Sequence, residues 1–136
     1  MIKKLRIFAI ILLLFLALNA IGGGLLLIAD PSGNSIRIPV ELLQGTPFSD
    51  YLIPGIILVL ANGILSLIVA ILTIKKIKNY ELFIILQGCV LIGWLTIEII
   101  LNKEFFSPTL HYPLYSMGVI FVVSGLTLMK RESHDI

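Results

Sequence analysis

Long apolar runs, separated by short charged stretches, dominate this sequence. The apolar residues fall in four segments, 7–29, 53–74, 82–101 and 112–129. Their lengths of 23, 22, 20 and 18 residues meet or approach the roughly 20 residues that a helix needs to cross a bilayer. None of them shows the polar face of a soluble bundle helix, and Glu98 is their only charged side chain. The pattern therefore predicts four transmembrane helices.

The runs are continuous rather than alternating, which favours helices over the strands of a membrane barrel. A helix also satisfies each backbone amide within its own segment. Only 13% of the 136 residues are charged, about half of the roughly 25% that is typical of soluble domains. A soluble enzyme and a nucleic-acid-binding protein are therefore disfavoured. We expect an all-α, polytopic membrane protein with a single domain over 1–136, in which four helices form an antiparallel bundle.

Basic residues flank the predicted spans unevenly. Two of them, Arg37 and Lys103, lie on one side, and eight lie on the other: Lys3, Lys4, Arg6, Lys75, Lys76, Lys78, Lys130 and Arg131. The positive-inside rule then places both termini in the cytoplasm, as an even number of crossings requires. A signal peptide is the competing interpretation of the N-terminus. The first apolar run is longer than such peptides use, however, and no A-x-A cleavage site follows it.

The connection between the first two spans, residues 30–52, is the longest and is rich in apolar residues. The string DPSGN predicts a tight turn, because Gly33 tolerates positive φ. The string PVELLQG (39–45) has proline and glycine where a helix starts and stops. We expect one or two helical turns there, with Leu42 and Leu43 resting on the membrane face of the bundle as a short ordered lid.

Two of the spans are entered by similar strings, TPFSDY at 46–51 and SPTLHY at 107–112. Two parallel hairpins related by an axis normal to the membrane would produce such a match. The interfacial preference of tyrosine explains it as well and is the favoured account. The second helix should begin near Pro54, since proline is tolerated only in a first turn.

Glu98 is the most distinctive candidate for function, because a carboxylate inside a span is costly and often marks a site. At helical spacing it shares one face with Gln87, Leu91 and Trp94. Such a stripe could line a cavity or bond to a neighbouring helix.

The position of Glu98 favours a structural role over a substrate or proton role. It lies three residues before the end of its span at Leu101, so it could reach water there. It could also pair with Arg37 or Lys103 on the same side of the membrane.

Asn19 and Asn62 are the next candidates, and adjacent antiparallel helices would bring them to the same depth. Buried amides of this kind usually hydrogen-bond across helices. The second span also carries a small, polar seam: Gly55, Asn62, Ser66 and Thr73. The first carries the small pair Ala20 and Gly24. Close helix packing is favoured over a ligand site as the explanation.

Several chemistries lack the residues that they need. Cys89 is the only cysteine, and the two histidines are His111, at a predicted helix start, and His134, in the tail. Disulfide exchange, haem ligation and a histidine-based metal site are therefore not supported. No nucleotide-binding or hydrolase motif occurs. We predict no cofactor, no metal, no catalytic residue and no nucleic-acid partner.

Three strings carry a resemblance: DPSG, then P-x-x-L-L-x-G-T-P-F-x-D-Y-x-I-P-G over 39–55, then G-W-L-T-I-E-I-I-L over 93–101. The chain resembles, from about Gly22 to Gly125, a group of uncharacterised small bacterial four-helix membrane proteins. The resemblance implies a place in the bacterial plasma membrane and no particular activity. Small multidrug transporters share the size but carry their membrane glutamate in the first helix.

Three functions follow as hypotheses. The favoured one is a binding or accessory component of the plasma membrane, in contact with the bilayer and pairing with itself or with another membrane protein. The second is a small proton-coupled transporter or channel that works as an oligomer. The third, with the least support, is a membrane enzyme on a lipid substrate. The candidate binding residues are Glu98, Trp94, Gln87, Asn19, Asn62 and Arg37.

Overall fold

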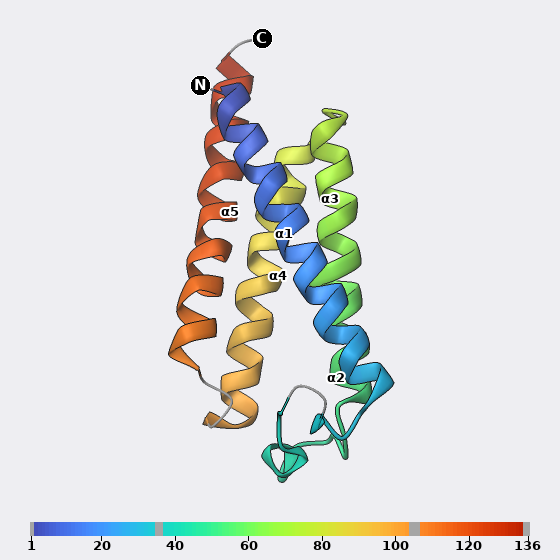
Figure 1. The fold of residues 1–136 in the computed structure, drawn as a ribbon. Coiled ribbons are helices and arrows are strands. Elements are labelled where there is room, and N and C mark those ends of the chain that lie inside the picture. The colour runs from blue at the N-terminus through green and yellow to red at the C-terminus, as the bar shows by residue number, and fades with distance from the viewer. Residues whose placement is uncertain (1, 35–36, 104–106, 135–136) are drawn as a thin grey trace.

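A computed structural model describes residues 2–34, 37–103 and 107–134 of the chain (Figure 1). Within these residues the fold is entirely helical, with no strand. The long helical segments are α1 (Ile2–Ala29), the continuous run of α2 (Leu52–Leu58), η3 (Val59–Ile64) and α3 (Leu65–Ile74), then α4 (Tyr80–Leu101) and α5 (Pro108–His134). The predicted all-α, four-helix fold is confirmed.

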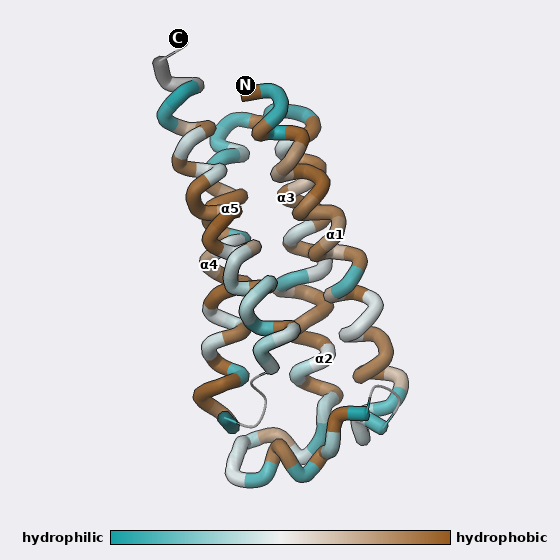
Figure 2. The backbone as a smooth tube through the Cα atoms, turned by 60° about the vertical axis from the view of Figure 1, so that its left-hand side comes forward, coloured by the Kyte–Doolittle hydropathy of each residue, from teal (hydrophilic) through white to brown (hydrophobic). Residues whose placement is uncertain are grey.

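All four segments are long and apolar enough to cross a membrane. Figure 2 shows that the middle of each is hydrophobic. Large apolar side chains also cover the outside, where Leu18 is 75% and Ile100 is 76% exposed. Lipid rather than water suits such a surface. The chain is therefore a multi-pass membrane protein. The helices extend beyond the predicted spans, since α1 begins at Ile2 and α5 at Pro108 rather than at 7 and 112.

The segments run antiparallel, and both termini lie at the same end of the bundle as the connection between α3 and α4 (Figure 1). We call this the terminal end. The connection between α1 and α2 and that between α4 and α5 lie at the opposite end, the loop end. The three stretches that carry eight of the ten basic residues are thus gathered at the terminal end.

Glycines let two pairs of helices approach closely. In α4 and α5, a Cβ atom added to Gly88 would lie 2.6 Å from the carbonyl oxygen of Gly118. In α1 and α2, a Cβ atom on Gly55 would lie 3.1 Å from the carbonyl oxygen of Gly24. Small residues at such contacts are typical of membrane helices, whose association depends on packing. The predicted role of Gly24 and Gly55 in close helix packing is confirmed. The close approach of Gly88 to Gly118 was not predicted.

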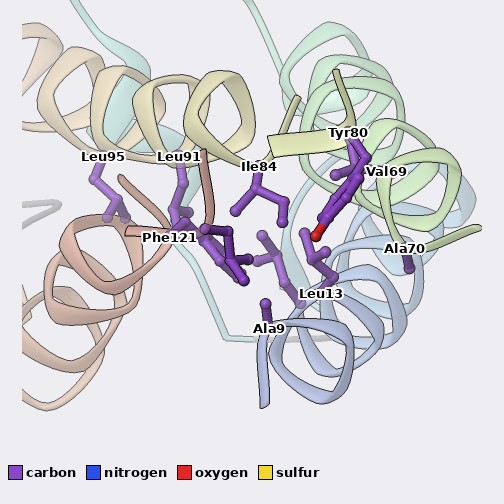
Figure 3. Close-up of a cluster of buried hydrophobic side chains, with 11 residues drawn as sticks. Ala9, Leu13, Val69, Ala70, Tyr80, Ile84, Leu91, Leu95 and Phe121 are labelled. Carbon is purple, nitrogen blue, oxygen red and sulfur yellow. The ribbon is translucent and has the colours of Figure 1, made fainter. Parts of the chain in front are cut away.

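The half of the bundle near the terminal end has a filled core. Side chains from several helices meet there, and the fully buried ones include Leu13 of α1, Val69 of α3, Ile84 of α4 and Phe121 of α5 (Figure 3). Ser66 and Thr73 of the predicted polar seam are also fully buried, as close packing requires.

The second span is not one regular α-helix. It begins at Leu52, which places Pro54 in the first turn as predicted. Its middle, η3, is π-helical over Val59–Ile64 and contains the fully buried Asn62. Short π-helical insertions are rare and frequently occur at functional sites. No pattern in the sequence predicted this one.

The connection between α1 and α2 folds much as its proline and glycine residues predict. Gly33 has φ +79° and donates its N–H to the carbonyl of Asp30 at 3.0 Å, which closes the tight turn. The predicted helical turn is the 3-10 helix η2 (Val40–Leu43). Leu43 is buried against Leu27 of α1, so this segment covers the loop end of the bundle.

Candidate functional site

A cavity of about 420 Å³ lies in the half of the bundle near the loop end. Side chains of α1, α2, η3, α4 and α5 form its walls, and Ile38, Leu43, Phe48 and Tyr51 of the connection between α1 and α2 form its roof. The volume lies within the range of roughly 300–1,000 Å³ that is usual for small-molecule sites. Most of the lining is aliphatic or aromatic, so the cavity suits an apolar molecule.

The structure brings four of the six candidate residues to this cavity: Asn19, Asn62, Trp94 and Glu98. Gln87 does not line it in the described part of the chain but hydrogen-bonds to Asn62. Arg37 is exposed and is not among the described lining residues. The predicted stripe on α4 therefore faces the interior, whereas Arg37 is not among the described residues that line the cavity.

Glu98 lies beside a histidine rather than beside the basic residues that we expected. Nε2 of His111 is 3.5 Å from Oε2 of Glu98. Arg37 and Lys103 are both exposed. The reason is the hairpin of α4 and α5: Glu98 lies near the end of one helix and His111 in the first turn of the next, so the two share one depth.

Hydrogen bonding orients the buried His111 ring toward Glu98. The backbone N–H of Ser107 donates to Nδ1 of His111 at 3.1 Å. When Nδ1 accepts this bond, the proton of the neutral ring lies on Nε2, which is 3.5 Å from Oε2 of Glu98, a distance of ion-pair contact rather than of a hydrogen bond. The Trp94 indole lies one turn earlier on the same face of α4. Glu98 and Trp94 therefore both line the cavity, and His111 lies beside the carboxyl group of Glu98.

Asn62 and Gln87 form a polar cluster in the middle of the bundle. Nε2 of Gln87 donates to the carbonyl of Ala61 and to Oδ1 of Asn62, both at 3.3 Å. Three buried atoms in and beside this cluster have no hydrogen-bond partner among the described residues: Nδ2 of Asn62, Oγ of Ser66 and Oε1 of Gln87. Unsatisfied buried groups are costly and call for an explanation. Since Asn62 also lines the cavity, its amide offers a donor to an occupant.

Asn19 does not take part in this cluster. Its side-chain amide donates to the carbonyl of Phe15 at 2.8 Å, within α1, and the residue is exposed. The hydrogen bond across helices that we expected for the two asparagines is thus found for Asn62, with α4 rather than α1. Asn19 lies at the cavity margin on the α1 side.

Tyr51 holds the roof of the cavity in place. Its hydroxyl donates to the carbonyl of Pro39 at 2.7 Å, and its backbone N–H donates to the carbonyl of Pro31 at 2.8 Å. Burial, together with the nearby carboxylates Glu41 and Glu98, raises the pKa of the Tyr51 hydroxyl to about 12. These bonds tie two points of the connection, Pro31 and Pro39, to one residue.

A second contact joins the roof to α4. The side-chain amide of Asn102 donates to the carbonyl of Leu42 at 2.9 Å. The roof is therefore anchored to the helix that carries Glu98.

The described residues contain no group of three or more histidine, cysteine, aspartate or glutamate side chains that could hold a metal ion. Glu98 and His111 provide only two side chains of these types, and the Trp94 indole near them is not one. The site is better suited to hydrogen bonding with a polar group than to binding a cation of this kind.

Comparisons with models of protein families, with curated proteins and with solved structures find no match for this chain. The resemblance to small bacterial four-helix proteins therefore stays a prediction.

Proposed function

We propose that this protein binds a lipid-like molecule, with one apolar chain and one polar end, in the cavity near the loop end. It would act as a binding or accessory component of the membrane. The observation that carries this proposal is a mostly apolar cavity that has Glu98 among its lining residues, with His111 in contact with that carboxyl group. Such sites usually combine apolar walls with a few placed polar groups.

The polar end of the occupant would lie beside Glu98 under the roof, and its chain would extend toward Asn62. Exposed Leu110 of α5 and exposed Asn19 of α1 both line the cavity. Their positions support entry of the molecule from the bilayer, between α1 and α5. A molecule that is already dissolved in lipid needs no aqueous path.

The location that we propose is the plasma membrane of a bacterium, with both termini in the cytoplasm. The gathering of eight basic residues toward the terminal end supports this orientation. The cavity would then lie in the outer leaflet, with its roof toward the outside of the cell.

A transporter or channel within one chain has less support. The filled core around Leu13, Ile84 and Phe121 lies between the cavity and the terminal end. An enzyme on a lipid substrate has one observation in its favour, the pair of Glu98 and His111. A carboxyl group and an imidazole in contact can act as general acid and base.

Filling the cavity tests the proposal, and neighbouring glycines of α1 provide a matched pair. Gly23 lines the cavity, and a Cβ atom there would meet only Leu58, at 4.0 Å. Gly22 has nothing within 4 Å of such an atom and is not a described lining residue. Gly23→Leu should therefore fill the cavity without a backbone clash, and Gly22→Leu should add the same side chain outside it.

The measurement is mass spectrometry of the apolar molecules that co-purify with the protein in mild detergent. Wild type and Gly22→Leu should retain one molecular species in comparable amount, and Gly23→Leu should lose at least about tenfold of it. Equal retention by both variants, or no enriched species in wild type, would refute binding in this cavity.

Glu98→Gln separates binding from catalysis in the same experiment. If Glu98 only holds the polar end, the substitution lowers occupancy about tenfold, because a charge-assisted hydrogen bond is lost. If it instead acts as an acid or base and contributes little to binding, the occupant stays bound and its unreacted form accumulates.

A further inference from the structure

A second hollow, of about 530 Å³, lies on the outside of the bundle at the terminal end, between the start of α1 and the end of α3. Its polar lining residues are Lys3, Arg6 and Lys76, and the rest of the lining is isoleucine. None of the described residues that line it is acidic. We call this hollow the basic groove. It shares no described lining residue with the cavity near the loop end.

The cations of the basic groove come from two elements and converge on one space. Lys3 and Arg6 are three residues apart on α1, a spacing that puts them on the same side of the helix. Lys76 follows α3, in a backbone conformation with φ +53°. Three positive charges around one hollow favour an anion with more than one acceptor oxygen, such as a phosphate.

Arg6 is held in place by α4. Its Nε donates to the hydroxyl of Tyr80 at 3.0 Å, and its guanidinium lies 5.8 Å from the centre of the Tyr80 ring. A guanidinium that is fixed in this way loses less conformational freedom when it binds an anion. One wall of the basic groove is thus ordered before any ligand arrives.

Apart from Ile2, which precedes Lys3, the isoleucines of the groove lie deeper along the bundle than its charges. Ile7 and Ile10 follow Arg6 on α1 by one and four residues, and Ile74 precedes Lys76 on α3. Ile7 and Ile74 are about half exposed, on the surface that faces lipid. The order from the end inward, cations and then isoleucines, matches a phospholipid, whose charged head lies at the interface and whose acyl chains lie below it.

We infer that the basic groove binds the phosphate headgroup of an anionic phospholipid, with Lys3, Arg6 and Lys76 on the phosphate and an acyl chain along Ile7 and Ile74. Basic pockets between membrane helices are known to bind such headgroups. A free phosphate compound would use the cations but would leave the isoleucines without a partner.

Charge-matched variants of the full chain test this inference. The groove variant is Lys3→Gln with Arg6→Gln and Lys76→Gln. The control is Lys4→Gln with Lys75→Gln and Lys78→Gln, which removes the same charge from exposed residues at the same end that do not line the groove. Each delipidated protein is titrated with phosphatidylglycerol, with phosphatidylcholine and with soluble glycerol 3-phosphate, and binding is read by native mass spectrometry.

Wild type should bind phosphatidylglycerol at least about tenfold more tightly than phosphatidylcholine, with no measurable binding of glycerol 3-phosphate. The groove variant should lose about tenfold or more of the affinity for phosphatidylglycerol, and the control less than about threefold. Equal losses in the two variants would overturn the inference in favour of diffuse attraction. Equal binding of phosphatidylcholine, or binding of glycerol 3-phosphate comparable to that of the lipid, would overturn it as well.

Arg6→Gln removes the bond to Tyr80 and can unfold the terminal end. The double variant Lys3→Gln with Lys76→Gln keeps that bond, and Lys4→Gln with Lys75→Gln is its control. The same ranking of affinities is expected for this pair, and its absence in folded protein would overturn the inference.

Discussion

The two halves of the bundle are built from the same kinds of residue, yet one is filled and the other is hollow. Near the terminal end, Ala9 and Leu13 of α1 share a core cluster with Phe121 and Leu128 of α5. Near the loop end, α1 and α5 face each other across a cavity of about 420 Å³. Hydrophobic composition alone therefore does not determine which part of a membrane bundle is filled by side chains and which part contains a cavity.

α1 packs against the second span along most of its length, and the cavity lies where α1 faces α5 in the loop half. The first half of α1 contacts α3 and also approaches α5, whereas its second half contacts α2 and η3 (Figure 1). Gly24 and Gly55 permit the second contact, because neither carries a Cβ atom where the two backbones meet. In the loop half the space between α1 and α5 is left open, and the roof covers it.

The largest expected effect comes from separating α4 and α5, which contribute to both halves. Gly88→Ala would place a Cβ atom 2.6 Å from the carbonyl oxygen of Gly118, a backbone atom that cannot rotate away. We expect a loss of about 3 kcal/mol in the free energy of unfolding. Gly93→Ala on the same helix is the control, because nothing lies within 4 Å of its added atom. Thermal unfolding in detergent measures both, and equal stabilities would refute the close contact.

The second prediction tests the difference between the halves directly. Ala9 is fully buried in the filled core, and Ala20 of the same helix lines the cavity. Ala9→Leu should lower the free energy of unfolding by about 1–3 kcal/mol, because the extra atoms have no space. Ala20→Leu should cost less than half as much, because its atoms enter space that already exists. If the two variants lose the same stability, the loop half is not hollow.

Much of the fold could be predicted because local rules determine it. The bilayer fixes the length of the four spans, and Gly33 and Pro39 mark the turns of the loop. The seam from Gly55 to Thr73 is buried as its small and polar residues suggested. The π-helical η3 could not be predicted, since no residue type at 59–64 requires it.

The candidate site was only partly predictable. Trp94 and Glu98 could be placed on one face of α4 from their spacing, but a cavity beside them depends on how α1 is tilted. No local sequence pattern specifies the tilt of a helix. The contact of Glu98 with His111 could have been predicted from the sequence, because an antiparallel hairpin brings the end of one span and the start of the next to the same depth in the membrane. The basic residues served only to predict the orientation of the chain in the membrane. The groove of Lys3, Arg6 and Lys76 was therefore not predicted.

The smallest effect that we predict concerns the roof of the hollow half. Tyr51→Phe removes the hydrogen bond to the carbonyl of Pro39 but keeps the ring in its apolar cluster. A loss of about 1 kcal/mol in the free energy of unfolding is expected from one such bond. Tyr51 also predicts a pH dependence, since its pKa in the folded protein is raised to about 12 from an ordinary 10.0.

The sign of the pH dependence follows from the direction of that shift. Below pH 10 the hydroxyl is neutral in folded and unfolded chains alike, and the full contribution of Tyr51 to stability is present. As the pH rises from about 10 toward 12, the unfolded chain releases this proton first, so stability falls through that window. The difference in unfolding free energy between wild type and Tyr51→Phe, followed over this range, isolates Tyr51 from the lysines that titrate alongside it. A constant difference would mean that the hydroxyl is open to water and that the roof does not seal the cavity.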